Sequence, residues 1–231
     1  PAIKGEVTFE HVTFGYEADK TVLKDLSFTV KPGESVALVG PTGAGKSTIV
    51  NLISRFYNVN GGRVLIDGQD ISKVTLHSLR SQMGIMLQDS FIFSGTIEDN
   101  IRYGKLDASL EEIIKASETV CADEFIRRFT DGYQTEVKER GSLLSQGQKQ
   151  LISFARTLLS DPSILVLDEA TSSIDVQTER ALQQGLNAML QGRTSFIIAH
   201  RLSTIKNCDK IMYIDQGGIM ECGTHDELMA K

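Results

Sequence analysis

The residues most suited to chemistry lie in one short run that combines glycines, a lysine and hydroxyl side chains. The run reads Gly40-Pro41-Thr42-Gly43-Ala44-Gly45-Lys46-Ser47-Thr48. Glycine can adopt positive φ, so backbone N–H groups of such a run can point inward at phosphate oxygens without a Cβ in the way. Lys46 would supply a compact positive charge for terminal phosphates, and Ser47 a hydroxyl for Mg²⁺. These residue types predict a cradle for the phosphates of a nucleotide.

The segments on either side of this run have the order that a phosphate site requires. Ser35–Val39 is a short apolar run of the kind found in strands buried on both faces. From Lys46 the apolar residues follow helical spacing, so a helix would direct the positive end of its dipole at the phosphate. Its apolar side would hold Ile49, Leu52, Ile53 and Phe56. Strand, glycine loop and helix together match the Walker A pattern, whereas the run alone could be a glycine-rich turn with a surface lysine.

A second strand supplies the carboxylates that such a site needs. Ile164–Leu167 is apolar and is followed directly by Asp168 and Glu169. Asp168 is the expected Mg²⁺ ligand, directly or through water, and Glu169 could polarise an attacking water. An acidic helix cap would explain both residues if the glycine run were absent. Together the two motifs predict a P-loop NTPase.

The remaining pattern predicts an α/β fold with a mostly parallel sheet in its core. From Val7 to Val30 apolar residues occupy every second position, with a break in phase between Phe9 and Val12 that indicates a bulge, so an antiparallel β subdomain opens the chain. After a mostly helical stretch, the alternation of strand and helix typical of a parallel sheet resumes. Further strands are expected at Arg63–Asp67, Met83–Leu87, Ile164–Leu167, Phe196–Ala199, Lys210–Asp215 and Ile219–Glu221, and further helices near Leu76–Ser81 and over Val176–Leu190.

These elements predict one domain over residues 1–231. Its core would comprise residues 1–89 and 161–231, and residues 90–160 would form a helical subdomain inserted between them. Two helices are expected to begin with a capping box. The pairs that would form these boxes are Ser109 with Glu112 and Thr224 with Glu227.

Composition limits the class of protein. The chain has 231 residues, of which 41% are hydrophobic and 23% charged, as is typical of a soluble globular protein. A formal charge of −6 without any block of like charges is unfavourable for binding a nucleic-acid backbone. Cys121, Cys208 and Cys222 are scattered, which argues against a disulfide framework and against a zinc site. No apolar stretch approaches the ~20 residues that span a bilayer, and no signal peptide is visible, so the sequence taken alone predicts a soluble domain.

A segment between the two motifs narrows the class. Leu144-Ser145-Gln146-Gly147-Gln148 resembles the signature of the ATP-binding cassette family, usually written Leu-Ser-Gly-Gly-Gln. Tyr16 stands where an aromatic residue stacks on adenine in that family, and His200 fits its switch histidine. Gln88 matches the glutamine of the Q-loop, and Ser172-Ser173-Ile174-Asp175 resembles the D-loop. The resemblance covers essentially the whole chain and implies a Mg²⁺-dependent ATPase.

The resemblance also implies a role for individual residues. Catalysis is assigned to Glu169, His200, Gln88 and Lys46, and Mg²⁺ coordination to Ser47, Gln88 and Asp168. Nucleotide binding is assigned to Tyr16, Val22, Gly40, Thr42, Gly43, Ala44, Gly45, Lys46, Ser47, Thr48 and Gln88, together with Ser145, Gly147, Gln148 and Asp175. In the family the signature caps the γ-phosphate bound by the opposite subunit, which implies a head-to-tail dimer, with an identical or homologous chain, around two Mg-ATP. Taken singly, Ser145 could be a helix N-cap, His200 a core histidine and Tyr16 a turn aromatic.

Two more segments resemble exporter-type cassettes. Thr135–Gly141 resembles the X-loop, and Gly95–Ile101 resembles the segment that follows the Q-loop glutamine. Both lie in the predicted helical insertion, which in this family receives the coupling helices of a membrane domain. The resemblance therefore implies a multidrug- or lipid-type exporter, with this domain at the cytoplasmic face of the membrane. The alternatives are a soluble cassette that acts on DNA ends or ribosomes, and a regulatory cassette that binds ATP without hydrolysing it.

Gln146 departs from the family signature because it replaces one glycine of the Gly-Gly pair. Similar signatures occur in subunits of heterodimeric exporters, in which one of the two sites is impaired, although a lone substitution could be neutral. Gln88, Asp168, Glu169 and His200 all match the family. The chain's own site is therefore expected to be catalytic, and any weakness would fall on the site that its signature completes.

Overall fold

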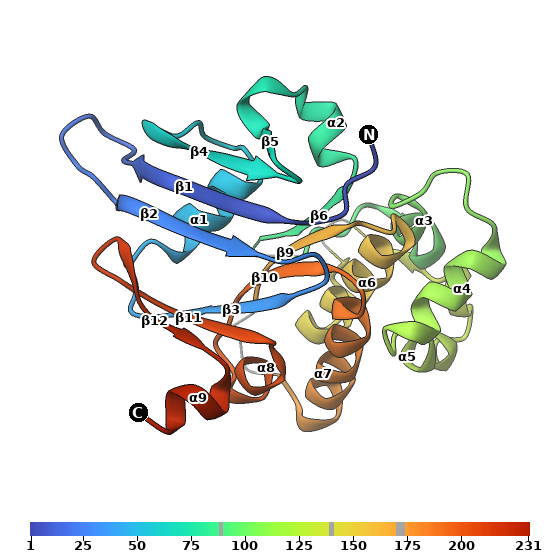
Figure 1. Ribbon diagram of the computed structural model, residues 1–231. Helices are drawn as coiled ribbons and strands as arrows, with labels where there is room; N and C mark the ends of the chain where they lie inside the picture. Colours follow the sequence, from blue (N-terminus) through green and yellow to red (C-terminus); the bar gives the residue numbers. More distant parts are fainter. Residues whose placement is uncertain (88–89, 139–140, 170–173) are drawn as a thin grey trace. The chain divides into compact units, whose positions relative to one another are not determined.

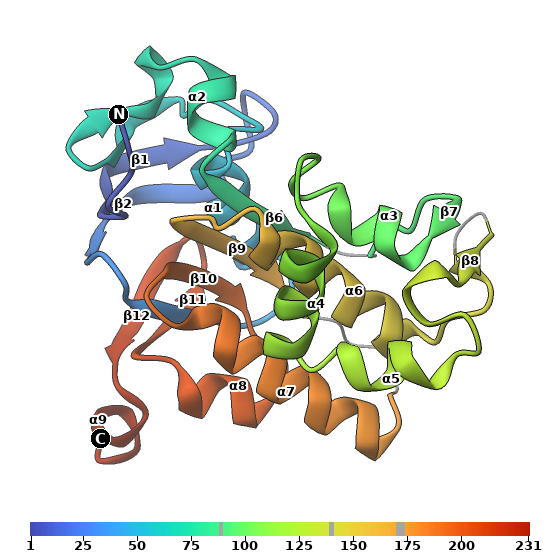
Figure 2. The same ribbon diagram turned by 90° about the vertical axis from the view of Figure 1, so that its right-hand side faces the viewer.

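The computed structural model describes residues 1–87, 90–138, 141–169 and 174–231 of the chain (Figures 1 and 2). Its contacts define two compact units. The first unit comprises Pro1–Ile85, Ser163–Glu169 and Gly192–Lys231, and the second comprises Met86–Pro162 and Ala170–Gln191. The functional division into a core of residues 1–89 and 161–231 with an insertion of 90–160 stays a prediction.

An antiparallel sheet opens the first unit. Its strands follow the order β2-β1-β4-β5. The pairing of β1 with β2 shifts register between Phe9 and Val12, so the predicted bulge is confirmed. Phe9 of β1 stacks on Phe28 of β2 with ring centroids 4.5 Å apart. The four strands are β1 (Val7–Phe14), β2 (Leu23–Val30), β4 (Gly61–Ile66) and β5 (Gln69–Asp70).

The second sheet of this unit has six strands in the order β12-β11-β3-β10-β9-β6. β3 is paired in parallel with β10 and β11, and β10 is also parallel to β9. The terminal hairpin of β11 and β12 is antiparallel. The mostly parallel sheet expected from the buried apolar runs is thus confirmed. The strands are β3 (Ser35–Val39), β6 (Met83–Met86), β9 (Ile164–Asp168), β10 (Thr194–Ile198), β11 (Lys210–Asp215) and β12 (Gly218–Gly223).

Helix α1 (Lys46–Ile53) lies between the two sheets in both views (Figures 1 and 2). It ends earlier than the sequence pattern predicts, because Arg55 adopts a left-handed backbone with φ 54°. The prediction that Phe56 lies on the apolar side of this helix is wrong: Phe56 is 45% exposed, and the guanidinium of Arg80 lies over its ring. The other helices of the unit are α2 (Leu76–Arg80), α8 (Leu202–Asn207), α9 (His225–Met229) and the 3-10 turn η1 (Ile71–Lys73).

The second unit is mostly helical, as the sequence predicts. Helix α6 packs on α3, α4 and α7. A short pair of strands, which the sequence pattern does not show, joins Gly95–Thr96 to Glu136–Val137. The elements are β7 (Gly95–Thr96), α3 (Ile97–Arg102), α4 (Leu110–Thr119), α5 (Asp123–Arg128), the 3-10 turn η2 (Gly132–Gln134), β8 (Glu136–Val137), α6 (Gln146–Leu159) and α7 (Val176–Leu190).

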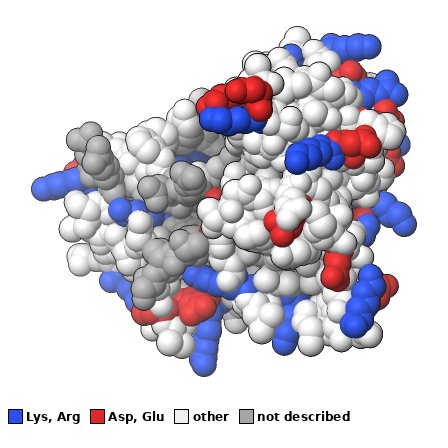
Figure 3. Space-filling model, turned by 90° about the vertical axis from the view of Figure 1, so that its left-hand side faces the viewer, with Lys and Arg blue, Asp and Glu red and all other residues white. Residues whose placement is uncertain are grey.

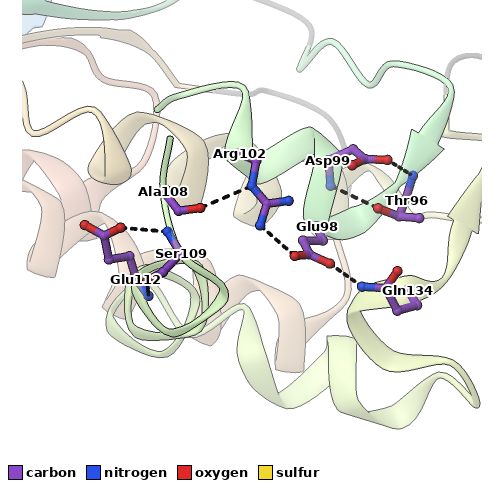
Figure 4. Close-up of polar contacts among 8 residues, drawn as sticks. All are labelled: Thr96, Glu98, Asp99, Arg102, Ala108, Ser109, Glu112 and Gln134. Atoms are coloured by element: carbon purple, nitrogen blue, oxygen red, sulfur yellow. Dashed lines mark hydrogen bonds and ion pairs between the residues drawn. The ribbon is translucent and has the colours of Figure 1, made fainter. Parts of the chain in front are cut away.

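Polar contacts fix the helix ends within this second unit (Figure 4). The predicted capping box of Ser109 and Glu112 is confirmed at the start of α4. On α3, the Arg102 guanidinium donates to the Glu98 carboxylate at 2.7 Å and to the carbonyl of Ala108 at 3.2 Å. The Gln134 amide also donates to Glu98, so one carboxylate joins α3 to η2. The second predicted capping box, Thr224 with Glu227, is confirmed at α9 of the first unit.

The described helices and surface add two observations. The longest helix in the described ranges, α7, spans Val176–Leu190, and none of the helices there is both long and apolar enough to cross a membrane. On the face drawn in Figure 3, Lys and Arg side chains are interspersed with Asp and Glu, without a patch of one sign. This mixed surface agrees with the absence of like-charge blocks in the sequence.

Candidate functional site

The candidate site lies where three parallel strands of the six-stranded sheet end. β10 is paired with β3 on one side and with β9 on the other, and Ile198 is in register with both Leu38 and Asp168. The carboxyl ends of parallel strands meet at one edge of a sheet, which is where ligands bind in open α/β folds. The segments that follow β3, β9 and β10 therefore leave the same edge.

The glycine loop leaves β3 in a conformation that only glycine fits well. Gly40 has φ 144°, and a Cβ at this position would lie 2.0 Å from the carbonyl oxygen of Ile214. Gly45, at the head of α1, has φ 116°. Both positions thus have the positive φ that the cradle requires, and α1 begins at Lys46 as predicted.

The polar side chains of the loop and of the first helical turn lie at the candidate phosphate site. Lys46 Nζ donates to the carbonyl oxygen of Gly40 at 2.5 Å, so the ammonium lies across the loop. Ser47 is exposed in the first turn of α1, and Thr48 is buried beside it. Thr42 and Gly43 are exposed at the tip of the loop, whereas Ala44 is buried. Val22, assigned to the same nucleotide pocket, is half-buried and bonded through its amide to the carbonyl of Phe14 at 2.8 Å.

Asp168, Glu169 and His200 lie together at the ends of β9 and β10. His200 Nε2 is 3.4 Å from Asp168 Oδ1. Glu169 is only 6% exposed, and its Oε2 accepts hydrogen bonds from the backbone amides of His200 at 2.8 Å and Arg201 at 3.0 Å. Its other oxygen accepts from the hydroxyl of Thr204. The Glu169 carboxylate therefore holds the segment that carries the histidine and opens α8.

Tyr16 lies beside α1. Its hydroxyl is 3.1 Å from Thr48 Oγ1, and the Asn51 side-chain amide donates to the same hydroxyl at 3.2 Å. The residue is 48% exposed. The half-exposed ring is therefore tied to the helix that begins at the glycine loop, and its role in stacking on adenine stays a prediction.

The signature segment lies in the second unit, at the head of α6. Ser145 is the N-cap of α6: its hydroxyl accepts from the amide of Gln148 at 3.2 Å, and Gln148 Oε1 accepts from the amide of Ser145 at 3.0 Å. The structure thus shows the helix-capping role for both side chains. Gly147 is buried, and a Cβ there would lie 2.2 Å from Thr178 Cγ2, so this glycine allows α6 to pack on α7. Gln146 is exposed.

Asp175 is the N-cap of α7 and accepts from the amide of Thr178 at 2.9 Å. The hydrogen bonds of Thr178 to this carboxylate lower the pKa of Asp175, so the residue is ionised at neutral pH. Gln88, Ser172 and Ser173 lie outside the described residues, as do Glu139 and Arg140 of the segment that resembles the X-loop. Their assigned roles stay predictions.

The structure thus brings the predicted residues together in two groups. The first unit holds the glycine loop, Tyr16, Asp168, Glu169 and His200, and the second unit holds the signature segment and Asp175. Sequence reasoning missed the partners of the first group, namely Thr204 and Arg201 beside Glu169, and Asn51 and Tyr57 beside Tyr16. No motif or period marks these residues, because each contact joins segments far apart in the sequence.

The parallel sheet, the glycine loop at its edge and the two acidic residues on the neighbouring strand define a P-loop nucleotide-binding domain. Comparison with known proteins gives the family. The ABC transporter family model matches residues 23–172 of this chain. The chain belongs to the ABC transporter family, and the part described is its ATP-binding, ATP-hydrolysing domain. The resemblance seen in the signature segment is thus confirmed.

Three similar proteins are each longer than this chain. It is 57% identical over 229 residues to the ABC transporter ATP-binding protein YknV of Bacillus subtilis, covering 99% of this chain and 38% of that protein. It is 49% identical over 231 residues to a fatty acid ABC transporter ATP-binding/permease protein of Mycobacterium bovis, covering 100% of this chain and 37% of that protein. A solved structure of a bacterial Atm1-family ABC exporter with ATP bound superposes with a TM-score of 0.91 at 48% identity, covering 100% of this chain and 40% of that one.

These relatives favour the transporter interpretation over a soluble or regulatory module. Two of the three are an ATP-binding/permease protein and an exporter, which join an ATP-binding domain to a transport function. The chain spans less than two thirds of the length of each of them.

Proposed function

We propose that this chain hydrolyses Mg-ATP as the nucleotide-binding domain of an ABC exporter, and that it acts in a head-to-tail dimer that powers transport across a membrane. The observation that carries the proposal is the sheet edge at which the glycine loop, Asp168, Glu169 and His200 meet. The ABC transporter family and the exporter named among the similar structures support it.

The phosphate end of the nucleotide would be bound by the loop and by α1. Lys46 would exchange the carbonyl of Gly40 for oxygens of the β- and γ-phosphates, while loop amides and the head of α1 stabilise their negative charge. Ser47 and Asp168 offer the hard oxygen donors that suit Mg²⁺, with Gln88 as a third assigned donor. Bound Mg²⁺ would neutralise charge that develops on the phosphate oxygens.

Hydrolysis would be an in-line attack of water on the γ-phosphate, in which the bond to the β-phosphate oxygen breaks and ADP leaves. Glu169 would orient or deprotonate that water, and His200 would bond to the γ-phosphate. In the structure the Glu169 carboxylate is bonded to the amides of His200 and Arg201 and to Thr204. Glu169 and His200 would therefore be placed together, because the Glu169 carboxylate fixes the segment that carries His200.

Two partners complete the proposal. The signature of a second cassette, identical or homologous, would close over the γ-phosphate with Ser145, Gly147 and Gln148, and Asp175 would lie at the same interface. A membrane domain would dock through its coupling helices on the segments Gly95–Ile101 and Thr135–Gly141, which places this domain at the cytoplasmic face of a membrane. The names of the ATP-binding/permease relatives support this second partner.

A mixing experiment tests the composite site. Lys46→Ala removes from one half-site the positive charge that would bind phosphate. Ser145→Asp places a negative charge at the signature while keeping a good helix N-cap. Each variant alone should show little phosphate release. A head-to-tail pair of the two contains one intact site, so an equimolar mixture should recover about a quarter of the wild-type rate.

The matched control is Ser145→Asn, which keeps the cap without adding charge and should hydrolyse ATP far better than Ser145→Asp. Both variants should retain the far-ultraviolet circular dichroism of the wild type. A mixture that stays as inactive as its separate components would refute the head-to-tail dimer. Wild-type protein that releases no phosphate would refute the ATPase assignment itself.

A further inference from the structure

The ring of Tyr16 contacts two aromatic residues, neither of which belongs to the assigned nucleotide site. Phe14 and Tyr57 each meet it with ring centroids 4.9 Å apart and an interplanar angle of 86°. Edge-to-face contacts of this kind are favourable beyond the apolar area that they bury. Neither neighbour lies parallel to the Tyr16 ring, and 48% of the residue remains exposed, so ring area is left for stacking a planar base.

The hydroxyl end of the same side chain is fixed by α1. Thr48 Oγ1 lies 3.1 Å from the Tyr16 hydroxyl, and Asn51 Nδ2 donates to it at 3.2 Å. The helix that carries Thr48 and Asn51 begins with Lys46 and Ser47 at the phosphate loop. The position of the ring is therefore tied to the helix that binds the other end of a nucleotide.

We propose that Tyr57 and Asn51 are positioning residues that hold Tyr16 as a preformed platform for the nucleotide base. This inference rests on the proposed nucleotide site, in which Tyr16 stacks on adenine. Tyr57 fixes the ring from the side, and Asn51 fixes its hydroxyl. Holding the side chain before the nucleotide arrives reduces the rotamer entropy that binding must overcome, so it raises affinity for the base without touching the phosphates.

The competing explanation is that the aromatic cluster only stabilises the junction between β1 and α1. Tyr57 is 48% exposed and lies beyond the end of α1, and its one ring contact besides Tyr16 among the described residues is with Phe14, at 5.7 Å between centroids, so only part of its surface serves core packing. Asn51 is half-buried, and its amide is bonded to the Tyr16 hydroxyl, a group that offers the core no apolar contact. Both observations favour positioning of Tyr16 over a purely structural role.

Titration calorimetry with two ligands separates the explanations. One ligand is an imido analogue of ATP, which is not hydrolysed, and the other is inorganic tripolyphosphate, which lacks the base; both are used with Mg²⁺. Tyr57→Leu and Asn51→Ala should each weaken the ATP analogue about five- to tenfold and leave tripolyphosphate unchanged. Tyr57→Phe keeps the ring contact and should behave as the wild type. Tyr103→Leu removes an exposed tyrosine that packs on Phe93 in the second unit, and it should change neither ligand.

A double-mutant cycle provides the decisive readout, because the proposed effect of Tyr57 and Asn51 on the base is transmitted through Tyr16. In a Tyr16→Ala background, Tyr57→Leu and Asn51→Ala should have no further effect on the ATP analogue. The inference is overturned if either effect persists in that background, if tripolyphosphate weakens equally, or if Tyr57→Leu binds as the wild type does. A wild type that does not bind the ATP analogue at all would instead overturn the proposed function. If variants of Tyr57 do not fold, the Asn51→Ala and Tyr16→Phe pair supplies the same cycle for the hydroxyl.

Discussion

Three residues assigned to the nucleotide site are bonded to the protein itself. Lys46 donates to the carbonyl of Gly40, the Tyr16 hydroxyl is bonded to Thr48 and Asn51, and the Glu169 carboxylate accepts from two backbone amides and a hydroxyl. Binding or catalysis by Lys46 and Glu169 therefore exchanges an internal hydrogen bond for one to substrate or water. Such an exchange contributes to binding or catalysis only the difference between the free energies of the two bonds, which is smaller than the free energy of either bond alone.

Glu169 is the residue at which chemistry and structure can be separated. Glu169→Gln keeps an oxygen that can accept from the amides of His200 and Arg201, but it removes the basic group, so hydrolysis should fall by about 10²- to 10⁴-fold while ATP binding is kept. Glu169→Ala removes both the accepting oxygen and the basic group. Because it leaves those buried donors without their partner, it should also lower the free energy of unfolding by about 1 to 3 kcal/mol.

Phosphate release, calorimetric titration with Mg-ATP and urea unfolding of the two variants measure these three quantities. Near-normal steady-state hydrolysis by Glu169→Gln would remove this residue from the catalytic role. Equal stability of the Gln and Ala variants would instead show that the carboxylate does not hold the segment that opens α8.

The elements that position the site were largely predictable from the sequence. β3, the start of α1 and β9 follow from apolar runs and from the glycine loop, because period and turn chemistry are local properties. The end of α1 was not predictable, since it depends on the left-handed Arg55, whose guanidinium donates to the carbonyls of Val74 at 2.6 Å and Ser72 at 3.2 Å. The pair of β7 with β8 is likewise formed by residues far apart in the chain.

The same limit applies to the candidate site. Motif types predicted Lys46, Asp168 and Glu169, and the resemblance to a family added Tyr16 and His200. The residues that hold these side chains, such as Thr204 and Asn51, carry no pattern of their own. Their contribution depends on three-dimensional proximity, which single-sequence reasoning does not provide.

Close packing of α7 can be tested at a glycine within the helix. Gly185 lies on α7, and a Cβ there would lie 2.4 Å from the carbonyl oxygen of Val120. Alanine is intrinsically favoured over glycine in a helix by about 1 kcal/mol. The contact should outweigh this preference, so Gly185→Ala should destabilise the protein by about 1 to 3 kcal/mol.

Urea unfolding monitored by circular dichroism measures the change. Gly218→Ala is the matched control, because the nearest atom to its added Cβ, Met220 Cε, lies 3.8 Å away, an ordinary contact. A Gly185→Ala variant that is more stable than the wild type would show that helix propensity prevails and that α7 does not pack so closely on the segment around Val120.

At the scale of the whole molecule, the assigned residues are divided between two compact units. The residues for the chain's own nucleotide lie in the first unit, and the signature segment and Asp175 lie in the second. A ligand that binds only the folded protein stabilises it by mass action, by about 2.7 kcal/mol at a concentration 100 times its dissociation constant. Nucleotide binding should therefore be detectable through any group that reacts only when the protein opens.

Cys208 is such a group. It is 6% exposed, and burial raises the pKa of its thiol to about 12. Since the thiolate is the reactive form, a raised pKa means that at pH 8 only about one thiol in 10⁴ is ionised, so alkylation in the folded state should be very slow. Cys222 is exposed and should react first, although burial also raises its pKa.

Pulsed alkylation at pH 8, followed by mass spectrometry of the peptide that contains Cys208, measures the opening reaction. Excess Mg-ATP should slow labelling of Cys208 by about two orders of magnitude if opening is global. Lys46→Ala should abolish that protection, because it removes the side chain that would bind the phosphates. Labelling of Cys222 should be unaffected, which makes it an internal control within the same molecule. If Cys208 is labelled as fast as Cys222 without denaturant, the burial of the Cys208 thiol is contradicted. If labelling of Cys208 is slow but Mg-ATP does not change its rate, opening at Cys208 is local and leaves the nucleotide site intact.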